Sequence, residues 1–153
     1  MKGTVIPMKN YCIISHTHWD REWYLPFEKF RIRLVDLIDN LLEILEKDKG
    51  YRFHLDAQTI VLEDYLKIRP QKEKILKKHI KNGRILVGPW YVQNDFHLVS
   101  GEATVRNLLI GMKIANDFGK CMMIGYAADQ FGLCSQLPQM LSGVGLDTCI
   151  FGR

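Results

Sequence analysis

The chain has 153 residues, of which 47% are hydrophobic and 25% charged, and its formal net charge is +4 at pH 7. This composition is typical of a globular domain with one core, and no apolar run approaches the roughly 20 residues of a membrane-spanning helix. The basic residues concentrate at 69–84 without interleaved aromatic residues, which argues against nucleic-acid binding. Scattered cysteines and an N-terminus without a long apolar stretch predict a reduced, cytoplasmic protein.

Short apolar runs alternate with helical periodicity along the whole chain. The apolar runs predict strands at residues 11–15, 51–55, 84–87, 122–126 and 148–151, the first of them buried. Apolar residues at helical spacing predict helices near residues 30–45, 60–66, 75–80, 105–114 and 137–141. Ser100 is expected to cap the fourth of these helices. Such alternation predicts an α/β fold with a parallel sheet and helical crossovers.

Acidic residues follow the predicted strands. They are Asp20, Asp56, Asp95 and Asp129, and Arg153 follows the last strand. The carboxyl ends of parallel strands carry the chemistry of α/β folds, so these residues are expected to converge on one site. Asp56 is equally well explained as a helix cap. Asp95 is expected to line the site, with a cap of the turn at 94–95 as the alternative.

The segment 16–24, His-Thr-His-Trp-Asp-Arg-Glu-Trp-Tyr, follows the first predicted strand. His16, His18 and Asp20 alternate, so an extended backbone would point all three the same way. Imidazole and carboxylate are ligands that zinc prefers, and Trp19, Trp23 and Tyr24 are platforms of the kind on which sugar rings stack. The alternative is that each residue is an ordinary cap or surface group. The combination predicts a metal-dependent site for a polyhydroxylated substrate.

Three segments in order, residues 16–23, 88–95 and 125–132, resemble motifs of the glycoside hydrolase family 38 α-mannosidases. The first segment is similar to the bacterial branch, which includes mannosylglycerate hydrolases that act on free or phosphorylated substrates. The third departs from many members at Leu133, where they have His. The resemblance implies a parallel-stranded β/α barrel, with residues 1–153 as the N-terminal portion of the catalytic domain and the rest of the enzyme beyond them.

The same resemblance implies a zinc-dependent retaining α-mannosidase. Asp129 would be both the catalytic nucleophile and a zinc ligand, and His18 and Asp20 would be the other ligands from this chain. Trp23 and Arg153 would lie near the substrate, an α-mannoside or mannosylglycerate-type carbohydrate, while His16 would be structural. The family's further His ligand and its acid/base aspartate lie beyond residue 153. We therefore expect residues 1–153 alone to be inactive, and a homo-oligomeric parent is left open.

Two other functions are compatible with these residues. A zinc-dependent sugar deacetylase also places Asp and His after strands, and it would release acetate rather than mannose. A non-catalytic carbohydrate-binding or zinc-binding module would show no turnover at all.

Overall fold

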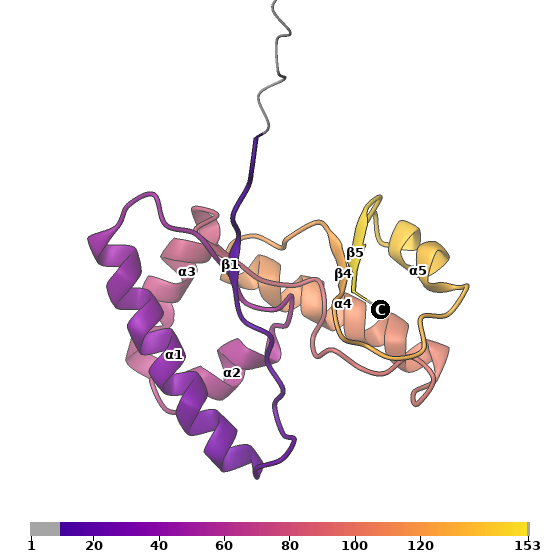
Figure 1. Cartoon of the computed structure of the whole chain (residues 1–153), viewed down its shortest axis with the longest axis horizontal. Coiled ribbons are helices and arrows are strands. Elements are labelled where there is room, and N and C mark those ends of the chain that lie inside the picture. The colour runs from indigo at the N-terminus through magenta and orange to yellow at the C-terminus, as the bar shows by residue number, and fades with distance from the viewer. Residues whose placement is uncertain (1–9, 153) are drawn as a thin grey trace, which may run out of the picture.

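The computed structural model describes residues 10–152, in which helices and strands alternate (Figure 1). The strands are short and span Ser15–His16 (β1), Phe53–His54 (β2), Ile85–Leu86 (β3), Gly125–Ala127 (β4) and Cys149–Phe151 (β5). The helices span Phe27–Lys47 (α1), Ile60–Leu66 (α2), Pro70–Lys72 (the 3-10 helix η1), Glu73–Lys81 (α3), Gly101–Phe118 (α4) and Leu137–Gly143 (α5). No helix among the described residues has the length and apolar character needed to cross a membrane.

The strands pair in parallel, which confirms the predicted α/β class with parallel pairing. One sheet has the order β1-β2-β3, and a second sheet pairs β4 with β5. The two sheets are joined where the Met122 amide donates to the Val87 carbonyl oxygen at 2.9 Å, between the end of β3 and the start of β4. Residues 10–152 form no closed barrel, so the expected barrel architecture is not seen in this part of the chain.

The segment before β1 differs from the prediction of a buried strand over 11–15. Tyr11 is 83% exposed and Ile13 is 95% exposed, and the first strand begins only at Ser15. The apolar residues have the strand propensity that the sequence indicated, but β1 pairs with β2 alone and no described segment covers the residues before it. Burial depends on a packing partner, which local sequence does not specify.

Helices α1, α2 and α3 bury a common core against the first sheet. In α1 the predicted apolar stripe is confirmed, because Leu34, Ile38 and Leu45 are almost fully buried. Leu62 of α2 and Leu76 of α3 belong to the same cluster. Figure 1 shows α1 and α3 to the left of β1 and α2 below it, while β4, β5 and α5 lie to its right. The first sheet is therefore packed on a continuous hydrophobic core.

Trp90, in the segment after β3, links that segment to the segment after β2 and to β4. It is fully buried, and its Nε1–H donates to the Tyr126 carbonyl oxygen in β4 at 2.6 Å. Its backbone amide donates to the Ala57 carbonyl oxygen at 3.0 Å, and its own carbonyl oxygen accepts from the Thr59 amide at 3.0 Å. The segment after β3 is therefore bound to the segment after β2 and to β4.

Helix α4 holds the segment after β3 in place by hydrogen bonds and by direct backbone contact. Its predicted cap is confirmed, since the Ser100 hydroxyl accepts from the Ala103 amide at 3.1 Å. Asn107 Oδ1 accepts from the Tyr91 amide at 2.8 Å, and Asn107 Nδ2 donates to the Val92 carbonyl oxygen at 2.6 Å. At Gly111 an added Cβ would lie only 2.2 Å from the backbone of residues 89 and 90. The lack of a side chain there allows the helix to touch this backbone directly.

Substitution of Gly111 by Ala should therefore destabilise the fold. A methyl group in this space would push helix α4 away from the backbone of residues 89 and 90. We therefore expect Gly111→Ala to lower the free energy of unfolding by about 2 kcal/mol or more, although Ala has the better helix propensity. Gly101→Ala is the control, because the same helix has open space there. Chemical denaturation compares the two variants; equal stabilities would contradict the close-approach explanation.

The second stability prediction concerns pH and His54, which is buried in β2. Burial, with a smaller contribution from His16, lowers the pKa of His54 from 6.5 to about 4. Because the unfolded chain takes up the proton at a higher pH than the folded chain, stability should fall as pH drops from 6.5 toward 4. His54→Phe, which keeps the ring contact with Tyr126, should remove up to about 3 kcal/mol of this loss. Unfolding free energies across this pH range provide the measurement, and an unchanged pH slope would contradict the prediction.

Candidate active site

Loops after β1, β3 and β4 surround a pocket of about 380 Å³. Its lining residues are His18, Asp20, Trp23, Gln93, Asp95, Asp129, Gln130 and Phe131. The lining includes five residues that the sequence analysis proposed for the site, His18, Asp20, Trp23, Asp95 and Asp129, but neither Asp56 nor His16. Arg153 lies outside the described residues. A second cavity of about 410 Å³, between α5 and β5, is lined mainly by apolar side chains and holds none of these residues.

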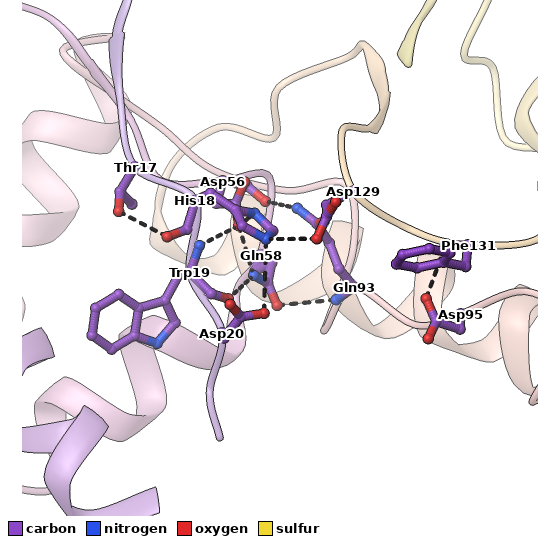
Figure 2. A network of polar contacts seen from close by, with 10 residues as sticks. All are labelled: Thr17, His18, Trp19, Asp20, Asp56, Gln58, Gln93, Asp95, Asp129 and Phe131. Atoms are coloured by element: carbon purple, nitrogen blue, oxygen red, sulfur yellow. Dashed lines mark hydrogen bonds and ion pairs between the residues drawn. The ribbon is translucent and has the colours of Figure 1, made fainter. Parts of the chain in front are cut away.

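His18 lies between three carboxylates (Figure 2). Its Nε2 is 3.3 Å from Asp129 Oδ2 and 3.7 Å from Asp20 Oδ1, while its Nδ1 is 3.0 Å from Asp56 Oδ2. The two ring nitrogens therefore face different carboxylates, with two acids on the open side and one on the buried side. Asp129 follows β4 and His18 follows β1, so this contact joins the two sheets at their carboxyl ends.

Asp56 is the buried member of this group, with 0% exposure. Its Oδ2 also accepts from the Trp19 amide at 2.7 Å and from Gln58 Nε2 at 3.1 Å. Burial raises the pKa of Asp56, and the Trp19 amide, His18 and Gln58 oppose that rise. The interpretation of Asp56 as a helix cap is wrong, because α2 begins at Ile60 and the Asp56 side chain turns toward His18 instead.

Two glutamines complete the network, and neither was singled out from the sequence. Gln58 Nε2 donates to the Trp19 carbonyl oxygen at 2.9 Å, and Gln58 Oε1 accepts from the Gln93 amide at 3.0 Å. Gln93 Nε2 donates to the Asp56 carbonyl oxygen at 2.6 Å. Their place close behind β2 and β3 was the available signal, since polar residues there tend to face the site.

Asp95 holds the loop that carries Asp129. Its Oδ1 accepts from the Phe131 amide at 2.8 Å, and the Phe96 amide donates to the Phe131 carbonyl oxygen at 2.9 Å. Gln130 Nε2 adds a bond to the Asn94 carbonyl oxygen at 3.2 Å. Asp95 therefore lines the pocket, and its side chain also holds the neighbouring loop in place.

The aromatic residues of the first motif divide into two groups. Trp19 and Tyr24 pack edge-to-face on Phe30 of α1, with ring centroids 6.0 and 5.4 Å away. Trp23 is 75% exposed and lines the pocket, so it is the tryptophan of this motif that is placed to meet a ligand. His16 does not join the pocket lining; it lies in β1 opposite His54 of β2.

A partly buried ion pair anchors the loop that carries these residues. Arg21 Nε donates to Asp64 Oδ2 at 2.6 Å, and Asp64 in α2 is almost fully buried. The Arg21 guanidinium also lies over the ring of Phe27, 4.3 Å from its centroid. The pair holds residues 19–24 against α1 and α2, away from the contacts of His18.

No three His, Cys, Asp or Glu side chains within residues 10–152 form a recognisable metal-binding cluster. What the geometry shows is one imidazole nitrogen facing two carboxylates at the rim of an open pocket.

Comparison with known proteins identifies the family. The model of the "Glycosyl hydrolases family 38 N-terminal domain" matches residues 8–153. The chain belongs to glycosyl hydrolase family 38. A relative from Halalkalibacterium halodurans, named "Putative mannosylglycerate hydrolase", is 53% identical over 92% of this chain. The crystal structure of an alpha-mannosidase from Enterococcus faecalis V583 is similar with a TM-score of 0.88 and 46% identity over 92% of this chain.

The family also contains eukaryotic relatives at lower identity, such as "Alpha-mannosidase 2C1" of Mus musculus, which is 29% identical over 87% of this chain. The chain spans 16% of the length of the Halalkalibacterium relative and 16% of the Enterococcus alpha-mannosidase chain. Its parallel-stranded α/β fold thus corresponds to the N-terminal part of these family 38 proteins.

The bond between Asp95 and the Phe131 amide leads to a prediction about the loop after Asp129. Asp95→Ala removes the acceptor, and we expect the Phe131 amide to exchange with solvent roughly 2–10-fold faster. Asp95→Asn retains an acceptor oxygen and should leave the exchange rate almost unchanged. Amide hydrogen exchange followed by NMR or mass spectrometry gives the rates; equal protection in the Ala variant would show that this bond does not hold the loop.

Proposed function

We propose that this chain is the N-terminal portion of the catalytic β/α-barrel domain of a zinc-dependent retaining α-mannosidase that continues beyond residue 153. The observation that carries the proposal is the meeting of His18, Asp20 and Asp129 at one pocket, from loops after two different strands. Family membership supports the reaction class, and the names of the bacterial relatives support a mannoside or mannosylglycerate substrate.

Zinc fits the donor set of the pocket. His18 Nε2 faces two carboxylates, and a cation among them would be bound by the Nε2 lone pair when the ring hydrogen is on Nδ1. Tetrahedral zinc with ligands about 2.0–2.1 Å away separates neighbouring ligand atoms by roughly 3.3–3.4 Å. The distance from His18 Nε2 to Asp129 Oδ2 is 3.3 Å, and that from Nε2 to Asp20 Oδ1 is 3.7 Å. His18, Asp20 and Asp129 would hold the ion, which would supply Lewis-acid contact with sugar hydroxyls.

In the proposed mechanism Asp129 attacks the anomeric carbon while the bond to the leaving-group oxygen breaks, giving a covalent mannosyl-enzyme. Retaining glycosidases need a second carboxyl group roughly 5–5.5 Å away, which protonates the leaving group and then activates water. We assign that group to residues beyond 153, so the present chain alone is inactive. The Asp95 and Gln130 bonds hold the loop of Asp129 in place, and Trp23 offers an apolar face to the sugar ring.

The lining of the pocket suits the neutral sugar of the substrate better than an anionic group. Its charged lining residues are Asp20, Asp95 and Asp129, and no Lys or Arg lines the described pocket. A glycerate carboxylate or a phosphate would be repelled by these acids. We therefore place any anionic group of the substrate outside this lining, with Arg153 as the candidate cation of this chain.

Activity of the full-length protein on an aryl α-mannoside tests the proposal. We expect hydrolysis that a zinc chelator abolishes and added zinc restores, and a loss of at least about a thousandfold in kcat for Asp129→Ala. Asp117→Ala, on an exposed part of α4, is the matched control and should keep full activity. Product analysis completes the measurement: release of acetate from an acetylated sugar without release of mannose would favour a deacetylase, and a full-length protein that neither turns over nor binds zinc would refute the proposal.

A further inference from the structure

We infer that Asp56 is a positioning residue, which fixes the orientation and tautomer of His18 and so sets the zinc affinity of the pocket. The inference rests on the proposed function, because it takes His18 as a zinc ligand. Asp56 is fully buried and does not line the pocket, and its Oδ2 contacts Nδ1 of His18 (Figure 2). It can act on a bound ion only through His18.

The bonds at Asp56 Oδ2 assign the proton on the imidazole ring. This one oxygen is 3.0 Å from His18 Nδ1, 2.7 Å from the Trp19 amide and 3.1 Å from Gln58 Nε2. The latter two groups can only donate, so Oδ2 is an acceptor and His18 Nδ1 carries the hydrogen toward it. The neutral ring then presents the lone pair of Nε2 to Asp20 and Asp129, which is the form that a metal ion binds.

The backbone supports the same role, because it adopts an unfavourable conformation to place Asp56. Asp56 has φ 49° and Ala57 has φ 56°, a left-handed region that is sterically unfavourable for residues other than glycine. Bonds on both sides maintain it: Gln93 Nε2 donates to the Asp56 carbonyl oxygen, and the Trp90 amide donates to the Ala57 carbonyl oxygen. The backbone of Asp56 and Ala57 is therefore held in a strained conformation, and this conformation directs the buried Asp56 carboxylate at the His18 ring.

The alternative is that Asp56 has only a structural role, in which it accepts the hydrogen bond from the Trp19 amide and holds the loop in place. The two roles differ in their need for charge. An Asn at this position can place its amide oxygen where Oδ2 lies and keep the bonds from Trp19 and Gln58, so a structural role survives the change. A role through His18 does not survive it fully, because a carboxylate raises the basicity of the ring more than an amide does.

Zinc affinity of the full-length protein separates these roles without relying on activity. We expect Asp56→Asn to raise the zinc Kd about tenfold and Asp56→Ala to raise it up to about a hundredfold, measured by competition with a chromophoric chelator. When Co²⁺ replaces zinc, the visible spectrum of the Co²⁺-loaded Asp56→Asn protein should differ from that of the Co²⁺-loaded wild type. Such a difference reports altered ligation by His18. The matched control is Asp64→Asn, which removes another buried carboxylate that anchors the same loop through Arg21.

Each outcome decides the inference. Weaker zinc binding in Asp56→Asn, with near wild-type affinity in Asp64→Asn, supports it. Wild-type affinity in Asp56→Asn overturns it while leaving the proposed zinc site intact, and an equal loss in Asp64→Asn overturns it by assigning the effect to loop stability. If Asp56→Ala does not fold, Asp56→Asn alone decides. A wild-type protein that binds no zinc would overturn both the inference and the proposed function.

Discussion

The arrangement of the site depends on one buried side chain, Trp90. Its indole N–H donates to β4. Its backbone amide and carbonyl group both bond to the segment after β2. These three bonds decide how the carboxyl ends of two separate sheets meet. Because the indole is fully buried, replacing any of the bonds by water would also open the core beneath it. The loops of the pocket therefore take their positions from a rigid interior.

The charge of the pocket is opposite to that of the chain as a whole. The net charge is +4, with many of the basic residues between 69 and 84, whereas the pocket lining holds Asp20, Asp95 and Asp129 and only His18 as a potential cation. A concave site with clustered carboxylates concentrates cations, which agrees with the proposed metal chemistry. The same clustering is costly without a counter-charge, which the proposed zinc ion would supply.

Local patterns predicted what depends on local physics. The apolar spacing in α1 and the cap at Ser100 appeared as expected, because helical periodicity and capping involve residues a few positions apart. The exposure of Tyr11 and the split into two sheets depend on which distant segments pack together, which periodicity does not contain. Asp56 shows the limit for sites: an acid after a strand looks the same whether it caps a helix or contacts His18, and only long-range packing separates the two.

The open edge of the first sheet has a consequence for handling the isolated chain. Within residues 10–152 the sheet order is β1-β2-β3, so β1 is an outer strand of the described sheet, and the exposed apolar residues Tyr11, Ile13 and Ile14 lead directly into it. Unpaired backbone groups beside apolar side chains form a template for strand addition by another chain. Concentrated solutions of this polypeptide should therefore self-associate through β1, and a charged residue introduced at position 13 would be the simplest way to keep it monomeric.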